Sequence, residues 1–300
     1  VEEVPRVLEL LRRHPRLMLA GLLSHFAEAD DLASPRTPRQ EERFAAVLAL
    51  LTEEERRQAS IHMANSAAAL YRPSSRGSLV RLGLALYGLD PVAGPEGLER
   101  LESREDPETR ETMVTTTNGE PAEACTPRME REGRGEAAVG SANKSGEESV
   151  ATLRPVMSVR ARIVQMREVQ AGTPISYGGR MVTARRSHIA VVPVGYADGY
   201  GWRLGGRAQA LVAGRRVPVA GSVTMDMTLL DVTGTGAEPG DEVVLLGRQG
   251  GEEISAAELA RHAGTISWEI LCHLGLRLPR RYLRGGQVEE LVSRFSREDG

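Results

Sequence analysis

Residues 60–88 read SIHMANSAAALYRPSSRGSLVRLGLALYG, and the rest of the chain is best interpreted from this stretch outward. It holds a short apolar run, a polar turn containing Asn65 and Ser66, a run of small residues and a second apolar run that ends in glycine. Asn and Ser are favoured at helix N-caps, so we expect a small helix to begin here. Unpaired N–H groups and the helix dipole make such an N-terminus a place where phosphate binds.

Arg81 and Gly83 lie on the second apolar run. Glycine lets a ligand approach the backbone closely. Two consecutive strand-to-loop junctions that share one phosphate are the arrangement found after strands 7 and 8 of TIM barrels. An ordinary helix cap beside a core arginine explains the same spacing equally well, so the pattern alone leaves both interpretations open.

The segments on either side of this stretch alternate between helical and strand patterns. Apolar residues recur at helical spacing over residues 4–14 and 41–51, while residues 17–26 form a nearly continuous apolar run typical of a buried parallel strand. We expect a loop over residues 30–39 and two further strands within the stretch quoted above. This order predicts βα units, and three strands cannot close a barrel, so further residues are expected upstream.

Composition divides the chain into three parts. We predict that residues 1–91 are the last βα units of an incomplete α/β barrel of the TIM type. Residues 92–152 are rich in Glu, Arg, Gly, Thr and Ser and lack periodicity, so we expect a disordered insertion, with a short charged helix as the alternative. Residues 153–300 alternate with period two and predict a mostly-β C-terminal domain with two short helices. Within it we expect a hairpin turn at residues 213–214 and a capping box at residues 255–258.

The overall composition excludes several classes of function. With a net charge of −3, the chain gives no electrostatic argument for binding nucleic acid or an anionic membrane. No apolar run approaches the roughly 18 residues of a membrane span. Only Cys125 and Cys272 occur, which argues against a disulfide framework or a metal site and fits a cytoplasmic protein.

Several side chains could carry chemistry. His25 ends the first predicted strand and could act as a general base, although a lone histidine is more often structural. Tyr177 precedes a glycine, Tyr196 lies in a glycine-rich turn, and Met225 precedes an aspartate. On residue type alone, each of these is more simply explained by packing.

The order of short motifs along the chain carries more information than any single residue. The motifs are HFAEAD at 25–30, HMANSAA at 62–68, VRLGLALYG at 80–88, ISYG at 175–178, GYADG at 195–199, MD at 225–226 and RLPRRY at 277–282. In these motifs the chain resembles the alanine racemases, which use pyridoxal 5′-phosphate (PLP) and combine a barrel with a β-domain. The resemblance covers nearly the whole chain except residues 92–151.

The resemblance implies a role for each candidate residue. Arg81 would face the pyridine nitrogen of PLP and, because arginine keeps its proton, leave that nitrogen unprotonated. This favours removal and return of a proton at Cα over transamination. The other residues that the resemblance places at the cofactor are Asn65, Ser66, Gly83, Leu84 and His62.

Racemisation also needs two proton carriers on opposite faces of the substrate. The resemblance assigns these roles to Tyr177 and to the lysine that holds PLP. His25, beside the cationic Arg81, would hydrogen-bond to Tyr177 and help it to act as a base. Tyr196 would narrow the substrate entrance, and the Met225 N–H would meet the substrate carboxylate.

Two departures from the family pattern stand out. The chain has a single lysine, Lys144, which lies in the polar insertion, and it has no segment like the one that carries the PLP lysine in the family. We therefore expect an N-terminally truncated racemase that is inactive by itself. Leu276 stands where family members often have a phosphate-binding tyrosine.

The predicted function is the interconversion of L- and D-alanine by a PLP-dependent homodimer, in which Tyr177 of one subunit completes the site of the other. A racemase of another small amino acid remains an alternative. A non-catalytic PLP-binding or dimerising remnant is another, because the PLP lysine is absent. A barrel-plus-β-domain decarboxylase is more distant, since its substrate-side segment is not recognisable.

Overall fold

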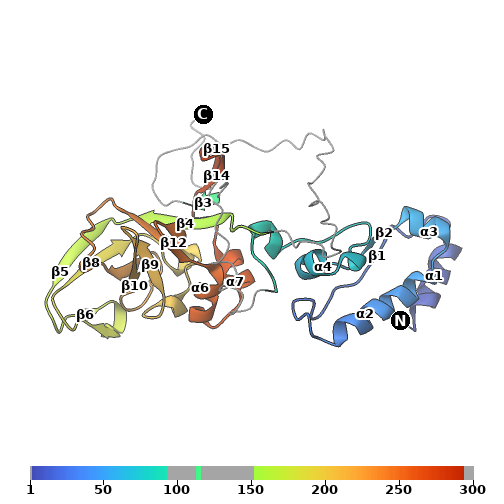
Figure 1. Cartoon of the computed structure of the whole chain (residues 1–300), viewed down its shortest axis with the longest axis horizontal. Helices are drawn as coiled ribbons and strands as arrows, with labels where there is room; N and C mark the ends of the chain where they lie inside the picture. Colours follow the sequence, from blue (N-terminus) through green and yellow to red (C-terminus); the bar gives the residue numbers. More distant parts are fainter. Residues whose placement is uncertain (1, 93–112, 116–151, 294–300) are drawn as a thin grey trace, which may run out of the picture. The chain divides into compact units, whose positions relative to one another are not determined.

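The computed structural model describes residues 2–92, 113–115 and 152–293 (Figure 1). These residues fall into two compact units, one made of residues 2–92 with 152–154 and the other of residues 113–115 with 155–293. No helix among the described residues is both long enough and apolar enough to cross a membrane.

The first unit is built of βα elements, drawn from blue to teal in Figure 1. In chain order these are α1 (Val4–Arg13), β1 (Gly21–Leu23), α2 (Arg36–Leu48), α3 (Glu53–Gln58), β2 (Ser60–His62), α4 (Ser66–Tyr71) and the 3-10 turns η1 (Pro73–Ser75) and η2 (Leu84–Tyr87). The two strands are parallel, with Gly21 opposite Ser60 and Leu23 opposite His62. The predicted parallel pairing is therefore confirmed, and both strands end on the same side.

Local sequence explains where these helices begin. The Asn65 side chain accepts a hydrogen bond from the Ala68 N–H at 3.1 Å, so the predicted N-cap of α4 is confirmed. Thr52 and Glu55 form a reciprocal capping box for α3, a helix that the sequence analysis did not predict. Small and apolar side chains from both strand ends and from α4 form the core of this unit: Phe26, Ala29, Met63, Ala64, Ala67, Ala68 and Ala69.

Three predictions for this unit were wrong in detail. The strand predicted over residues 17–26 is only three residues long, and Leu17 and Leu23 are exposed, because β1 has β2 as its single partner among the described residues. Helix α2 begins at Arg36, inside the predicted loop, since proline is tolerated in a first turn whose N–H groups lack acceptors. The apolar run at residues 79–82 forms no strand and leads into η2.

The second unit is mostly β, as predicted. Its strands are β3 (Met113–Thr115), β4 (Met157–Arg162), β5 (Gln165–Val169), β6 (Pro174–Ile175), β7 (Met181–Val182), β8 (Ser187–Val192), β9 (Gln209–Val212), β10 (Arg215–Pro218), β11 (Thr228–Asp231), β12 (Glu242–Gln249), β13 (Glu252–Ile254), β14 (Arg280–Arg284) and β15 (Gln287–Val292). Short 3-10 turns η3 (Tyr177–Gly179), η4 (Tyr196–Asp198) and η5 (Trp202–Leu204), and helices α6 (Ala256–Ala263) and α7 (Ser267–His273), complete it.

The largest sheet of this unit has the strand order β10-β9-β12-β4-β3-β14-β15, with β13 paired to β12. A second sheet has the order β11-β8-β5, and β6 and β7 form a small hairpin. Alternation at Val159, Ala161 and Ile163 places all three side chains in the core, as expected for period two. The predicted hairpin turn is also confirmed, because Ala213 and Gly214 both have positive φ, as a type I′ turn requires.

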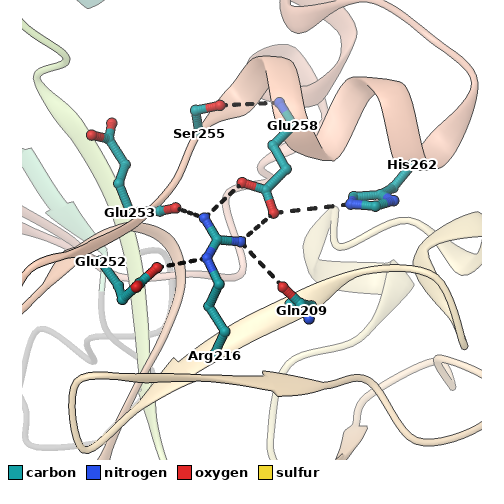
Figure 2. A network of polar contacts seen from close by, with 7 residues as sticks. All are labelled: Gln209, Arg216, Glu252, Glu253, Ser255, Glu258 and His262. Carbon is teal, nitrogen blue, oxygen red and sulfur yellow. Dashed lines mark hydrogen bonds and ion pairs between the residues drawn. The ribbon is translucent and has the colours of Figure 1, made fainter. Parts of the chain in front are cut away.

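One predicted cap forms only in part (Figure 2). The Ser255 hydroxyl accepts the Glu258 N–H at 3.0 Å, as expected for the start of α6. The Glu258 carboxylate does not return to the Ser255 N–H but accepts a hydrogen bond from Arg216 Nη1 at 2.7 Å. Arg216 also donates to Glu252 and Gln209, so it ties the β9–β10 hairpin to α6.

Most of the insertion predicted over residues 92–152 lies outside the described residues. Within it, Met113–Thr115 forms β3, which pairs with β4 in parallel and with β14 in antiparallel orientation. The expectation of no regular structure was therefore wrong for this short stretch. Its local sequence has little periodicity, and backbone hydrogen bonds to two neighbouring strands define it.

Candidate active site

Arg81 is the centre of the polar groups at the strand ends of the first unit. Its Nη2 donates to the Ser24 carbonyl at 2.7 Å and to the Met63 carbonyl at 3.3 Å. The same nitrogen lies 3.1 Å from His25 Nδ1, and Nη1 contacts His62 Nδ1. Ser24 and His25 directly follow β1, and His62 ends β2. The predicted grouping of His25, His62 and Arg81 is thus present.

The chemistry of arginine fixes the roles in this cluster. A guanidinium has only donors, so both histidine Nδ1 atoms act as acceptors, which places the ring protons of neutral His25 and His62 on Nε2. The Nε–H of Arg81 has no acceptor among the described residues. A half-buried, permanently charged donor is therefore available to a ring nitrogen or another acceptor brought by a ligand.

Ser66 joins the two loops that follow β2. Its hydroxyl oxygen accepts the N–H groups of Gly83 at 2.8 Å and Ala85 at 3.3 Å, so it ties the start of α4 to the start of η2. The predicted convergence of the two loops is therefore present, although the described residues just before the second loop form no strand. Leu84 is buried, so only its backbone can reach a bound molecule there.

Gly83 and the first turn of α4 leave room and donors for an anion. A Cβ added at Gly83 would meet no atom within 4 Å, so its side-chain position is open space rather than a packed contact. Among the described residues, no acceptor contacts the N–H groups of Ser66 and Ala67, which have no intrahelical partner. These groups fit the phosphate of PLP, with Asn65 fixing the helix start.

The second unit brings the other three predicted residues together. Tyr177, Tyr196 and Met225 line one cavity of about 910 Å³, together with Trp202, Ser222 and Asp226. The Tyr177 side chain is 78% exposed, and Met225 is 53% exposed. The cavity is therefore open to solvent and presents a phenol hydroxyl, apolar side chains and backbone groups.

Two turns at this cavity are joined through their backbones. The Tyr196 N–H donates to the Thr224 carbonyl and the Ala197 N–H to the Met225 carbonyl, both at 3.0 Å. A Cβ at Gly195 would collide with these two carbonyl oxygens, which explains the glycine at this position. The turn that carries Met225 is therefore fixed against the turn that carries Tyr196.

Arg277 holds the same turn from the other side, and the sequence analysis did not identify it. Its Nη2 donates to Asp226 Oδ1 at 2.7 Å, and its Nε lies 3.2 Å from Asp198 Oδ1. The hydrogen bond with Asp226, followed by the charge of Asp198, raises the pKa of Arg277. The RLPRRY motif pointed to this segment, but the partners of Arg277 are too distant in sequence for spacing to reveal them.

A cation–π contact at the cavity was also missed. The Arg180 guanidinium lies 4.7 Å from the centre of the Trp202 ring. No signal in the sequence links these two residues, which come from different turns. Their contact adds a positive charge to the rim of the cavity.

Some expectations about the site stay predictions. Tyr177 and His25 lie in different units, and the hydrogen bond between them stays a prediction. Lys144 lies outside the described residues. Leu276 is 58% exposed and carries no hydroxyl, so its side chain cannot replace the phosphate contact of a tyrosine.

Two family models match the chain. The one described as "Alanine racemase, N-terminal domain" matches residues 1–91, and the one described as "Alanine racemase, C-terminal domain" matches residues 156–282. Together they cover more than half of the chain. The segment between them contains the predicted insertion.

Curated relatives extend over both matched regions. The alanine racemase of Symbiobacterium thermophilum is 37% identical over 287 residues, which make up 95% of this chain and 62% of that protein. Alanine racemase 2 of Bacillus subtilis is 31% identical over 289 residues, 96% of this chain and 61% of that protein. The chain therefore spans less than two thirds of the length of these relatives.

Solved structures agree with these matches. Alanine racemase from Bacillus anthracis with bound L-Ala-P aligns with a TM-score of 0.73 at 31% identity, covering 97% of this chain and 62% of that chain. Alanine racemase from Bartonella henselae with covalently bound pyridoxal phosphate aligns with a TM-score of 0.64 at 24% identity, covering 91% and 59%, which shows the fold alone. The predicted architecture, part of a barrel followed by a β-domain, is confirmed. The chain belongs to the alanine racemase family.

Proposed function

We propose that the protein interconverts L- and D-alanine with PLP as cofactor. The observation that carries the proposal is Arg81, a permanently charged donor held by two strand ends with its Nε–H free of described acceptors. The bound L-Ala-P in the Bacillus anthracis relative supports alanine as the substrate. The Bartonella henselae relative contains covalently bound pyridoxal phosphate.

PLP, when bound, supplies an electron sink that makes the substrate Cα–H acidic enough to be removed. Arg81 would donate its Nε–H to the ring nitrogen and, because it does not release its own proton, keep that nitrogen unprotonated. Ser66 and Ala67 would hold the phosphate through their N–H groups at the start of α4, and the open side-chain position of Gly83 would leave room for it. These residues would therefore bind and orient the cofactor, and Arg81 would keep its ring a weaker electron sink.

Tyr177 would move a proton at Cα from one face of the substrate. Among the described residues its hydroxyl has no hydrogen-bond partner, which supports a role toward a bound molecule. His25 accepts from Arg81 through Nδ1, and its Nε2–H, which has no acceptor among the described residues, would hydrogen-bond the Tyr177 oxygen and favour its deprotonated form. The Met225 N–H, also without an acceptor among the described residues, would bind the substrate carboxylate beside Tyr196.

The lysine that serves as the second proton carrier is proposed to lie outside residues 1–300. Lys144 is followed in the sequence by Ser145 and Gly146, and it lies in no segment like the one that carries the PLP lysine in the family. The chain also spans only 62% of the Symbiobacterium thermophilum relative, which leaves room for a lysine elsewhere in the fold.

We also propose that the enzyme is a cytoplasmic homodimer. Exposed apolar and aromatic side chains surround the cavity at Tyr177, which favours cover by a second copy whose barrel brings the PLP site. The residues concerned are Tyr177, Tyr196, Trp202, Met225 and Met227. The low cysteine content fits a reducing compartment.

The test is a chiral assay of the holoenzyme with L-alanine, D-alanine and other small amino acids. We expect equilibration of the alanine enantiomers at a rate above that of the competitors. Borohydride reduction followed by peptide mapping should place the pyridoxyl group on a lysine other than Lys144. Faster turnover of another amino acid would refute alanine as the substrate, and an adduct on Lys144 would refute the assignment of the lysine.

A further inference from the structure

Ser176, which precedes Tyr177, has a backbone conformation that residues other than glycine rarely adopt. Its φ is 65° and its ψ is −177°. Among the described residues only Ser176 and Ala213 combine a side chain with positive φ. Ala213 is explained by the type I′ turn between β9 and β10, whereas Ser176 lies in a region occupied almost entirely by glycine.

Contacts on both sides hold Ser176 in this conformation. Its hydroxyl donates to the Ser222 carbonyl at 2.9 Å, and its carbonyl accepts the Gly179 N–H at 3.2 Å. The preceding residue, Ile175, is buried and pairs with Met181 across the β6–β7 hairpin. The backbone is therefore fixed immediately before Tyr177 by a side-chain bond, a turn and a core residue.

Gly221 shows how closely the hairpin approaches the neighbouring segment. A Cβ at Gly221 would lie 2.8 Å from the Ser176 Cβ and 2.9 Å from the Ile175 carbonyl oxygen. Any larger residue would push Ser176 away. Gly221 and Ser222 lead directly to the turn that carries Met225, so this contact links the backbone of Tyr177 to that turn.

The Tyr177 side chain itself has little to hold it in this unit. It is mostly exposed, and Gly178 and Gly179, which follow it, both have positive φ. The direction in which the phenol leaves the backbone is consequently set by Ser176. Tyr177 and Met225 line the same cavity, so their separation depends on the contact of Ser176 with Gly221 and Ser222.

We propose that Ser176 is a positioning residue, held in an unfavourable conformation so that the Tyr177 hydroxyl lies at a fixed place relative to the Met225 N–H. This inference rests on the proposed role of Tyr177 as a proton carrier. Backbone strain of this kind persists only where surrounding contacts maintain it, and it concentrates at functional sites. Substitutions at Ser176 can therefore separate stability from catalysis.

The test compares Ser176→Gly and Ser176→Ala in the holoenzyme, with Ala213→Gly as the matched control. Ser176→Gly also loses the bond to Ser222 and therefore loosens Tyr177, but it relieves the backbone strain, so we expect an unchanged or higher Tm and a kcat lower by about 10-fold or more. Ser176→Ala keeps the strain and loses the bond to Ser222, so both Tm and kcat should fall. Ala213→Gly also relieves a positive φ, so its Tm should be unchanged or higher, as in Ser176→Gly. Its kcat should equal that of the native enzyme.

Deuterium exchange at Cα identifies which proton carrier is affected. In Ser176→Gly we expect exchange to fall more for one alanine enantiomer, the same one that Tyr177→Phe affects, with KM changed little. Three results for Ser176→Gly would each overturn the proposal. These are a native kcat, an equal loss of deuterium exchange for both alanine enantiomers, and a Tm below that of Ala213→Gly. If Tyr177→Phe is itself fully active, the proposed function of Tyr177 fails first, which separates the two claims.

Discussion

Arg81 gathers groups that are far apart in the sequence. Its acceptors follow β1 and end β2, and its own N–H donates to the Ala64 carbonyl at 2.9 Å. A planar guanidinium bound on both terminal nitrogens has little freedom to rotate, so its Nε–H points in one direction. A lysine could not reproduce this geometry, because its ammonium is a single point of charge. The orientation of one donor therefore determines the electronic state of the cofactor in the proposed mechanism.

Replacing Arg81 by Glu should change the course of the reaction more than it weakens the binding of PLP. A carboxyl group facing the pyridine nitrogen would let that nitrogen take a proton and strengthen the electron sink. We expect a new long-wavelength absorbance when alanine is added to the holoenzyme, and more transamination. Both are measured by absorbance spectroscopy and by assay of pyruvate.

Arg39→Glu makes the same charge change at an exposed position on α2 and is the control for Arg81→Glu. The control should show neither the absorbance nor the transamination. A variant at Arg81 that still binds PLP and shows neither effect would mean that Arg81 does not face the ring nitrogen.

At the scale of the elements, charged pairs connect helices of the first unit. Arg12 on α1 donates to both carboxylate oxygens of Glu55 on α3, at 2.8 and 2.7 Å. The Thr52 N–H also donates to this carboxylate, at 2.8 Å, so one side chain caps α3 and binds α1. The hydrogen bonds from Arg12, followed by that from Thr52, lower the pKa of Glu55 to about 2.

The lowered pKa predicts an acid-sensitive contribution to stability. Because the folded pKa lies below the usual value of about 4.3, the stabilisation is complete above about pH 4.3 and is lost as the pH falls toward 2. Glu55→Gln should lower Tm by about 2–4 °C near neutrality, and this difference from the native protein should shrink on acidification.

Thermal unfolding at several pH values measures the effect, with Glu53→Gln as the control. Glu53 is exposed on the same helix, and its replacement makes the same change in net charge. The control should change Tm little at any pH. A difference for Glu55→Gln that stays constant down to about pH 3 would contradict the role of the ionised carboxylate.

Several elements with local signals were predicted, although α3 with its Thr52–Glu55 capping box was missed, and elements defined by distant contacts were not predicted. The Asn65 cap, the 213–214 turn and the alternation in β4 each depend on a few adjacent residues, and all are present. The start of α2 was missed because it falls inside the loop predicted over residues 30–39, although proline fits a first turn. Strand β3 was missed because its partners, β4 and β14, are distant in sequence.

At the scale of the whole molecule, each of the two units carries candidate site residues of its own. The sequence motifs identified residues on both: Arg81, His25 and Ser66 on the first, Tyr177 and Met225 on the second. They could not identify Arg277 or Ser176, because the role of each depends on partners about 50 residues away: Asp226 for Arg277 and Ser222 for Ser176. Motif order thus predicts which residues meet the ligands, and the folded structure adds those that hold them in place.

In the proposed mechanism, Tyr177 moves a proton at Cα of alanine in a PLP-dependent racemase. The most direct measurement is deuterium incorporation into L- and D-alanine by the holoenzyme and by Tyr177→Phe in D₂O. We expect the native enzyme to exchange both enantiomers. Tyr177→Phe should retain PLP absorbance but lose exchange of one enantiomer by about 10²–10⁴-fold. Unchanged exchange of both enantiomers by Tyr177→Phe would contradict the account.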